Sequence, residues 1–565
     1  MRTQNKIQKL TLGMCAFLIL GIGEYAAREN VAASILGNAD SSRPNAFAAR
    51  IHGRTLAGNH SVQGASLTNS PLSPFVAGDL DTTFGGSGKV TTQFGGEEDV
   101  ATSLVLQSDG KIVCSGYSAS AVSTIAFVAR YNSDGSLDAS FGTAGKATQD
   151  FGAGFSSATS VALQSDGKIV VAGYARPSAA ATTGFDFFVL RYNANGTLDT
   201  AFGAGGRVIT DFSAVDEADV VLIQTDGKIV VTGSTSNNSL DRTFAALARY
   251  NTDGSLDASF GTAGKVIGHE GSAYSAVLQP DGRLVTGGWG CAIATCTSNL
   301  DFTFARYDTA GALDPAFGTS GKATVAVSTG RDEAHSIVLQ SDGKIVASGV
   351  NLNSPTANPV AIVRLNANGS LDTTFGTGGI VQGLPIVVED AFGVSLQSSG
   401  KIITGGRVFT TATDSDFAIV RLNTNGTLDT TFSNGGIATT LFSGNFDGIT
   451  DTAIQSDGKI VAVGFAGNQA GGIDAAMARY LTSVSVSGRV TSPSGAGLRN
   501  ATVVITDSLG GKQFATTSSF GFYTFDNVRP GDTYQISVNS RLYRFAVQSF
   551  AITDNLTNID FAGLE

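Results

Sequence analysis

The sequence has few of the residues that most catalytic sites are built from. Its 565 residues include one Trp, four Cys, four His and 11 Pro, and two of the histidines, His52 and His60, lie near the N-terminus. No His-Glu-x-x-His, nucleophile-elbow or phosphate-loop motif occurs. Charged residues make up only 15% of the chain and the net charge is −11, which argues against a nucleic-acid partner. The sequence therefore predicts no catalytic residue, no cofactor and no metal ligand.

Long hydrophobic runs are also lacking, apart from one at the N-terminus. Leu10 to Gly23 is apolar and follows the basic residues Arg2, Lys6 and Lys9. This pattern is typical of a secretory signal peptide, and the run is shorter than the roughly 20 residues that a membrane span needs. We expect residues 1–33 to be removed, 34–77 to form a flexible spacer, and the mature chain, without a transmembrane segment, to be secreted or held at the cell surface.

Removal of that segment would leave three cysteines, an odd number that excludes complete pairing within the chain. Cys114 takes a strand position that is Val or Ala in most equivalent segments, so we expect a buried thiol. Cys291 and Cys296 bracket a short loop and are expected to form a disulfide in an oxidising compartment. A metal site is the alternative, but no His or further Cys lies nearby.

The feature that organises the chain is a turn between two apolar strands, shown best by Leu163 to Gly173. The turn recurs at steps of 55 to 61 residues. Its seven copies are Asp109-Gly110-Lys111, Asp166-Gly167-Lys168, Asp226-Gly227-Lys228, Asp281-Gly282-Arg283, Asp342-Gly343-Lys344, Ser399-Gly400-Lys401 and Asp457-Gly458-Lys459.

Each unit of the repeat contains four short runs that alternate apolar and polar residues, with Gly, Asn and Asp between them. Four antiparallel strands repeated seven times indicate an all-β, seven-bladed β-propeller over residues 78–481. The array opens on a strand and ends at Ala478-Arg479-Tyr480. We therefore expect residues Gly88 to Phe94 to supply the outermost strand of the last blade and close the ring.

Three motifs, Leu-Gln-Ser-Asp-Gly-Lys-Ile-Val, Ala-Arg-Tyr-Asn and Gly-Ser-Leu-Asp-Ala-Ser-Phe-Gly, together resemble the delta-60 repeat family of bacterial β-propellers. This resemblance implies a secreted or surface propeller and supplies no catalytic residues. Residues 484–565 resemble the carboxypeptidase regulatory-like family, a small transthyretin-like β-sandwich often classed with carbohydrate-binding-like folds. The residues that carry this second resemblance are Val486-Ser487-Gly488-Arg489-Val490, Ala501 to Asp507 and Gly521 to Phe525.

Two recurrent polar patterns have structural interpretations. Asn132 to Asp138 resembles part of a calcium loop, but Arg130 stands where the first acidic ligand would be, so a turn stabilised by Asn and Asp side chains is favoured. An Arg and an Asp eight residues later are expected to form an ion pair that locks the link between blades. These pairs are Arg130/Asp138, Arg191/Asp199, Arg249/Asp257, Arg306/Asp314, Arg364/Asp372 and Arg421/Asp429.

Length variation points to one face of the ring as the binding face. The loop between the middle strands of each blade varies, whereas the turns on the opposite face keep nearly the same length. Variable loops on a rigid scaffold are where binding residues usually lie. Trp289, at the start of one such loop, is the predicted ligand contact, with ordinary packing as the alternative.

Function is the least determined part. The leading hypothesis is a secreted, monomeric, non-enzymatic binding or scaffold protein whose partner is a glycan or an extracellular protein. The alternative is a propeller-type polysaccharide hydrolase or lyase that uses carboxylates in the channel. We expect these acids to be solvated loop residues rather than catalysts; they are Glu97, Asp99, Asp216, Glu217, Asp332, Glu333, Glu389 and Asp390.

Overall fold

The structure is a computed structural model, and it describes residues 77–564 apart from eleven short gaps. The gaps are 153, 177–183, 213–214, 238–241, 291–299, 352–359, 385–387, 412–413, 443–445, 469 and 553–555. The predicted signal peptide and nearly all of the predicted spacer lie outside the described residues, as do Cys291 and Cys296. Within the described ranges every regular element is a β-strand, which confirms the all-β prediction, and no helix there could cross a membrane.

The repeats form the blades of a β-propeller, and each blade is an antiparallel sheet of four strands. Within each blade the strands follow in order from the channel outward, so that the first strand is the innermost. The first two blades are β2 (Glu98–Leu106), β3 (Ile112–Ala119), β4 (Thr124–Tyr131), β5 (Lys146–Gln149), then β6 (Ser156–Leu163), β7 (Ile169–Ala175), β8 (Asp186–Tyr192), β9 (Arg207–Thr210). The third blade contains β10 (Asp216–Ile223), β11 (Ile229–Ser236), β12 (Thr243–Tyr250) and the first part of β13 (Lys265–Leu278). The second part of β13 is the innermost strand of the fourth blade, which continues with β14 (Leu284–Gly290), β15 (Asp301–Tyr307) and β16 (Lys322–Val325).

The remaining three blades follow the same order. They are β17 (Asp332–Leu339), β18 (Ile345–Asn351), β19 (Val360–Leu365), β20 (Ile380–Val381); β21 (Val388–Leu396), β22 (Ile402–Thr411), β23 (Asp414–Leu422), β24 (Ile437–Thr440); and β25 (Asp447–Ile454), β26 (Ile460–Gly467), β27 (Ile473–Tyr480), β1 (Lys89–Thr92). The second strands are apolar on both sides because each blade packs between two neighbours. In β7, for example, Ile169, Val170, Val171 and Ala172 are all fully buried.

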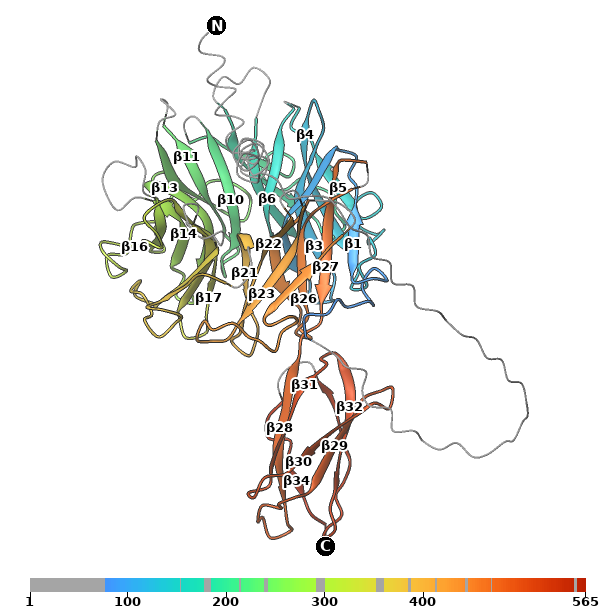
Figure 1. Cartoon of the computed structure of the whole chain (residues 1–565). Helices are drawn as coiled ribbons and strands as arrows, with labels where there is room; N and C mark the ends of the chain where they lie inside the picture. Colours follow the sequence, from blue (N-terminus) through green and yellow to red (C-terminus); the bar gives the residue numbers. More distant parts are fainter. Residues whose placement is uncertain are drawn as a thin grey trace, which may run out of the picture. The chain divides into compact units, whose positions relative to one another are not determined.

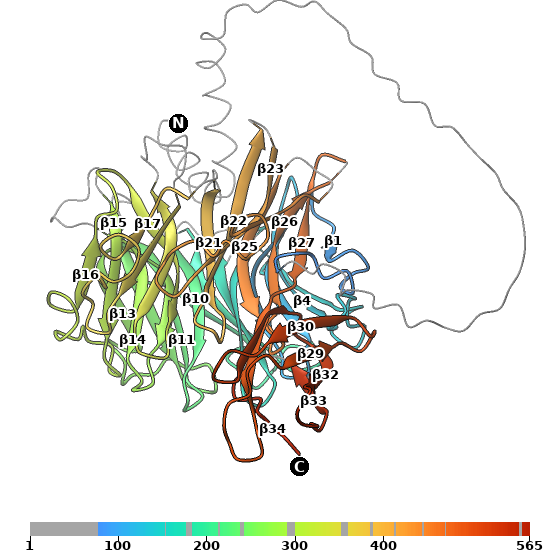
Figure 2. The ribbon, with the colours of Figure 1, turned by 60° about the horizontal axis from the view of Figure 1, so that its bottom comes forward.

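The ring closes through the N-terminal end of the propeller, as predicted. β1 pairs antiparallel with β27, from Lys89 opposite Ala478 to Thr92 opposite Ala475. Figures 1 and 2 both show β1 beside β27. The closure extends further than the sequence suggested, because Leu80 bridges to Tyr480 and the fully buried Phe84 lies under the guanidinium of Arg479 at 4.6 Å. The segment Leu80 to Phe84 thus takes the place of the Leu-Asp-x-x-Phe segment that the last repeat lacks.

The predicted Arg–Asp pairs form in all six repeats that contain them. In the first blade Arg130 Nε donates to Asp138 Oδ2 at 2.8 Å, and both side chains are buried. The pair lies in the link between the third and fourth strands of one blade, so the prediction of a link between blades needs a correction. The contact to the next blade comes instead from Arg130 Nη1, which donates to the carbonyl oxygen of Ala194.

Arg421, the arginine of the sixth blade, lacks among the described residues the hydrogen bond to the next blade that Arg130 makes. Nη1 of the fully buried Arg421 has no hydrogen-bond partner in the described part of the chain, although its Nε donates to Asp429 at 2.7 Å. Its expected acceptor would lie in the turn after β27, where the other blades have an Asn-rich or Asp-rich turn. There the chain continues instead into β28 (Val484–Thr491).

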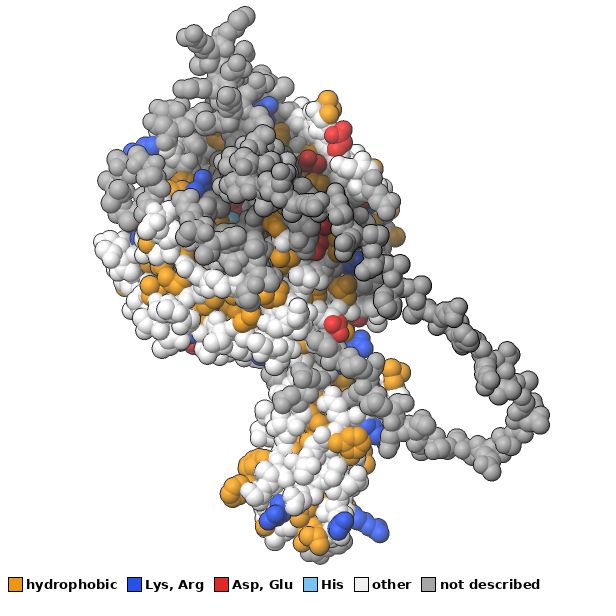
Figure 3. All heavy atoms as spheres, viewed as in Figure 1, with side chains coloured by type: hydrophobic (Ala, Val, Ile, Leu, Met, Phe, Trp, Pro, Cys, Tyr) orange, Lys and Arg blue, Asp and Glu red, His pale blue; other side chains and the backbone are white. Residues whose placement is uncertain are grey.

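The C-terminal domain consists of two small sheets that enclose a separate core. One sheet has the order β31-β28-β34 and the other β30-β29-β32-β33. Val503, Ile505, Phe525 and Ile536 are among the residues buried between them. The bounds are β29 (Thr502–Thr506), β30 (Lys512–Thr516), β31 (Phe522–Val528), β32 (Asp532–Asn539), β33 (Gln548–Ile552) and β34 (Phe561–Ala562). Figure 3 shows few charged side chains on the face in view, in keeping with the low charged fraction.

Candidate functional site

The innermost strand of every blade carries a β-bulge, and the bulge determines which side chains reach the channel. In the second blade Ala158 pairs with Gly173 and Ser160 with Ala172, so that Thr159 is the extra residue. A Cβ atom on Gly173 would lie 2.0 Å from the carbonyl oxygen of Ser157, so only glycine fits opposite the bulge. The seven bulge residues are Thr102, Thr159, Asp219, Tyr274, His335, Phe392 and Thr450.

Three of the bulge residues are threonines that tie neighbouring inner strands together. The hydroxyl of Thr102 donates to the carbonyl of Ala158 at 2.8 Å, and that of Thr450 donates to Ala101 at 2.6 Å. Thr159 makes the same contact with Ala218 at 2.7 Å. These bonds run from blade to blade around the channel, so this half of the channel wall is engaged in structural contacts.

The other half of the wall carries one acid and three rings. His335 stacks on Phe392 with ring centroids 5.0 Å apart, and its other neighbour Tyr274 meets it edge-on at 5.9 Å. Nδ1 of His335 and Oδ2 of Asp219 are buried atoms that have no hydrogen-bond partner among the described residues. Asp219, Tyr274, His335 and Phe392 are each partly exposed, so four adjacent blades, the third to the sixth, carry a row of polar and aromatic side chains along their innermost strands.

Trp289 belongs to this surface. It lies in β14 opposite Ser272 of β13 and is half-buried, and its Nε1 donates to the hydroxyl of Tyr274 at 3.0 Å. At the equivalent pairs in neighbouring blades the sizes are reversed, because Glu217 stands opposite Ser234 and Glu333 opposite Val350. The role of Trp289 as a ligand contact stays a prediction.

Carboxylates surround the aromatic surface. Glu333 is buried and pairs with Arg331 and, at 3.5 Å, with Nε2 of His335. Burial and the charge of Asp216 raise the pKa of Glu217 to about 7. Burial together with the charge of Glu217 raises the pKa of Asp219 well above its usual value. At neutral pH this half of the channel can therefore both donate and accept hydrogen bonds through its carboxyl groups.

The acids that precede the inner strands do not all behave as predicted. Glu97 is exposed, in agreement with a solvated loop acid, but Asp99, Asp216 and Asp332 are fully buried. Each accepts a backbone N–H from the preceding crossover; for Asp332 the donors include Val327 at 2.8 Å. They are buried caps because the crossover brings unpaired backbone donors to the start of each inner strand. The side chains of Glu389 and Asp390 lie outside the described residues.

The structure tests the predicted turn and one of the two cysteine predictions. Asp134 Oδ1 accepts hydrogen bonds from the backbone and the hydroxyl of Ser136 at 2.9 and 2.6 Å, which confirms the interpretation of the Asn132 segment as a turn. Cys114 is buried and free, and burial raises the pKa of its thiol to about 12. The predicted disulfide between Cys291 and Cys296 falls on residues that the structure does not describe.

Only one group among the described residues places three carboxylates close enough to share a metal ion. It consists of Asp186, Asp211 and Asp216 at the joint between the second and third blades.

The bulge residues and Asp186 were not predicted from the sequence. The signal for the bulges was present, since a glycine recurs opposite each bulge, at Gly116, Gly173, Gly233, Gly288, Gly349, Gly406 and Gly464. Strict alternation assigns side chains beyond a bulge to the wrong side of the strand. Asp186 gave no signal, because its partners lie 25 and 30 positions further along the chain.

Comparison with known families agrees with the two-part architecture. Seven stretches match the family described as domain of unknown function (DUF5122) beta-propeller, at residues 107–141, 164–202, 224–260, 279–317, 340–375, 397–432 and 455–483. Residues 485–562 match the carboxypeptidase regulatory-like domain. The chain belongs to the DUF5122 β-propeller family, in line with the repeat motifs, and carries a C-terminal carboxypeptidase regulatory-like domain, as the motifs after residue 484 predicted.

Among solved structures the similarity is distant. Virginiamycin B lyase from Staphylococcus aureus, in a catalytically inactive form with quinupristin, is 12% identical; the match covers 69% of this chain and 98% of that one, with a TM-score of 0.38. The polysaccharide lyase Uly1 is 12% identical; the match covers 67% of this chain and 89% of that one, with a TM-score of 0.39. Sqt1 from Chaetomium thermophilum is also 12% identical; the match covers 76% of this chain and 97% of that one, with a TM-score of 0.36. These likenesses carry no argument about function, and no curated protein matches the sequence.

Proposed function

We propose that this protein is a secreted or surface-exposed glycan-binding protein that takes a sugar chain at the channel surface formed by Asp219, Tyr274, Trp289, His335 and Phe392, without catalysing a reaction. The observation that supports it most is the asymmetry of the channel wall. One half is engaged in threonine bonds between blades, whereas the inner strands of the other half carry, in place of the threonines, an acid and three aromatic rings that are each partly exposed.

The chemistry of this surface suits a neutral or amino sugar. Aromatic rings offer flat apolar faces for sugar C–H groups, and carboxyl oxygens accept hydrogen bonds from hydroxyl or amino groups. Burial alone would raise the pKa of Glu333, but hydrogen bonds and charges of His335 and Arg331 hold it below its usual value. Glu333 is therefore ionised and would repel a uronate or a sulfated sugar in the same place. An extracellular protein that inserts a basic or aromatic side chain is the other partner class.

A glycan array with the purified protein tests the proposal, followed by calorimetry with the best neutral oligosaccharide. Trp289→Ala should weaken binding by about 1–2 kcal/mol if the indole contacts the sugar. Asp134→Ala, in a turn on the opposite face, serves as the control and should leave the affinity unchanged. Unchanged affinity in Trp289→Ala, together with loss in Asp134→Ala, would place the ligand on the wrong face for this proposal.

The second candidate, a polysaccharide hydrolase or lyase, is favoured by one observation. A carboxyl group with a pKa near 7, such as Glu217, is suited to donate a proton at neutral pH. Release of reducing ends or of unsaturated products from a bound polysaccharide would support this activity. Its loss in Glu217→Gln with unchanged binding would assign Glu217 a catalytic role and overturn the non-enzymatic proposal.

A further inference from the structure

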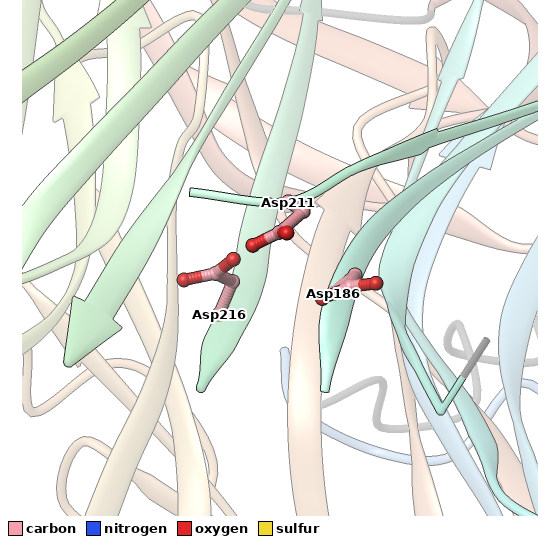
Figure 4. A group of neighbouring side chains, drawn as sticks. All are labelled: Asp186, Asp211 and Asp216. Carbon is pink, nitrogen blue, oxygen red and sulfur yellow. The ribbon is translucent and has the colours of Figure 1, made fainter. Parts of the chain in front are cut away.

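The joint between the second and third blades brings together three carboxylates from separate segments. Asp186 begins β8, Asp211 follows β9, and Asp216 begins β10. One oxygen from each lies within 4.8 Å of the others, and Figure 4 shows the three side chains grouped around a common space. The group therefore joins a middle strand of one blade, the crossover, and the innermost strand of the next blade.

Asp186 is the member of this cluster whose carboxylate is buried without a partner in the described part of the chain. Only 5% of the residue is exposed, and its carboxylate has no hydrogen bond or ion pair with any described residue. Asp216, by contrast, accepts hydrogen bonds from the backbone of Phe212 and the hydroxyl of Thr235. A largely buried carboxylate without a partner is costly, and it is usually compensated by a cation or by protonation. Burial and the charges of Asp211 and Asp216 raise the pKa of Asp186 to about 6.

Other joints show that the fold does not require these acids. Between the first and second blades, Ser156 occupies the place of Asp216, and its hydroxyl group accepts from the backbone of Ala126 and donates to Gln149, both at 3.1 Å. Those neutral bonds satisfy the joint. Related pairs of buried acids occur at two other joints, Asp301 with Asp332 and Asp416 with Asp447, and Asp414 lies near the second pair. Among the described residues, neither joint brings three carboxylate oxygens within 4.8 Å of one another. The acids at the second joint are thus an addition to a joint that closes without them.

We propose that Asp186, Asp211 and Asp216 bind one calcium ion, which fastens the second blade to the third on the face that carries the variable loops. All three donors are oxygens and none is nitrogen or sulfur, which selects a hard cation such as calcium, magnesium or manganese. Calcium fits best because it tolerates irregular arrangements of six to eight oxygens, whereas magnesium requires a near-ideal octahedron. The exposed position of Asp211 leaves room for water or backbone oxygens to complete the coordination.

The proposal is tested on the purified protein after treatment with a chelator and buffer exchange. Isothermal titration with CaCl2 should show one site per chain, with a Kd of about 10⁻⁴ to 10⁻³ M or tighter, as in extracellular calcium modules. Addition of calcium should raise the melting temperature. Asp211→Asn, which changes the exposed member of the group, should weaken binding by about tenfold or more. Asp186→Asn should abolish binding and also raise the melting temperature of the calcium-free protein, because it removes a buried charge.

Asp301→Asn is the matched control, since it changes the equivalent position of the fourth blade, and it should leave the calcium affinity unchanged. If Asp186→Asn does not fold, Asp211→Asn and the control still decide the question. Absence of both heat and thermal shift with up to about 5 mM calcium would overturn the proposal, as would binding that both Asp variants leave intact. Tighter binding of magnesium than of calcium would overturn the choice of ion.

Discussion

Arg479 and Asp81 lie 398 positions apart in the chain, yet Nε of Arg479 donates to Oδ2 of Asp81 at 2.9 Å. The pair repeats at the ends of the propeller the contact that the other six blades make within eight residues. Lys459 adds a second cation to the same Asp81 oxygen at 3.4 Å, and Nη1 of Arg479 donates to the carbonyl of Ser133 in the first blade. Closure thus depends on ion pairing as well as on the strand pairing of β1 with β27.

Asp81→Ala should destabilise the protein by about 3 kcal/mol or more, because it leaves the buried Arg479 without its carboxylate. Chemical denaturation measures this loss. Arg242→Ala, which removes a partly exposed ion pair with Glu270, is the control and should change stability by less than about 1 kcal/mol. Asp138→Ala breaks the same kind of lock inside one blade. Limited proteolysis should therefore cut residues 80–94 faster in Asp81→Ala than in Asp138→Ala, and equal cutting would contradict this account of closure.

Stability should pass through a maximum in mildly acidic solution. The pKa values of Asp186, Asp447 and Asp451 are raised to about 6, chiefly by burial, so the folded state binds their protons more tightly than the unfolded state does. Without divalent cations the melting temperature should rise as the pH falls from 8 towards 5. Calcium should reduce this rise if Asp186 holds an ion, and a melting temperature that falls over that interval would contradict the assignment.

Below pH 4 the opposite effect should dominate. Hydrogen bonds from Ser140 and the charge of Arg130 lower the pKa of Asp138 to about 2 against its burial. Burial alone would raise the pKa of Asp372 and Asp429, but hydrogen bonds and neighbouring cations hold both at about 2. The stability that these carboxylates contribute is complete above their unfolded pKa of about 4 and is lost as the pH falls towards 2. Thermal scans from pH 5 to pH 2 should show this decline, and Asp372→Asn should make it shallower.

Gly173→Ala should destabilise the second blade strongly, by about 3 kcal/mol or more, because the added Cβ would lie 2.0 Å from the carbonyl oxygen of Ser157. Gly86→Ala is the control, since a Cβ there meets no atom within 4 Å and its cost comes from a φ of +75° alone. Denaturant midpoints of the two variants measure the difference. Equal midpoints would show that the bulge relaxes around an alanine and does not require the glycine.

The cysteines should differ in reactivity. Cys114 is buried and its thiol has a raised pKa, so it should resist alkylation in the native protein and react fully in denaturant. Mass spectrometry of the unreduced protein should find Cys291 and Cys296 joined. Two free loop thiols, or fast labelling of native Cys114, would contradict these expectations.

The sequence was sufficient to predict the number of blades, the Arg–Asp pairs and the closing strand, because each depends on spacing along the chain. It was not sufficient to identify the channel surface. The bulges shift Asp219, Tyr274 and His335 out of simple alternation, and only pairing across strands reveals the shift. The cluster of Asp186, Asp211 and Asp216 depends on how a crossover folds back, which no local pattern reports. Asp99 and Asp332 were misjudged for a related reason, since their backbone donors belong to the crossover.

The closing segment also sets an order of events during synthesis. Phe84 is fully buried in the finished ring, but the strand that completes its surroundings ends at Tyr480, nearly 400 residues later. When six blades have been synthesised, β27, the partner of β1, has not yet been made. The first apolar residues of the propeller therefore stay exposed to solvent until then. The ring can close only after β27 has left the ribosome, when synthesis has already passed into the C-terminal domain. Assembly of this protein is therefore timed by its last blade, whichever blades begin to fold first.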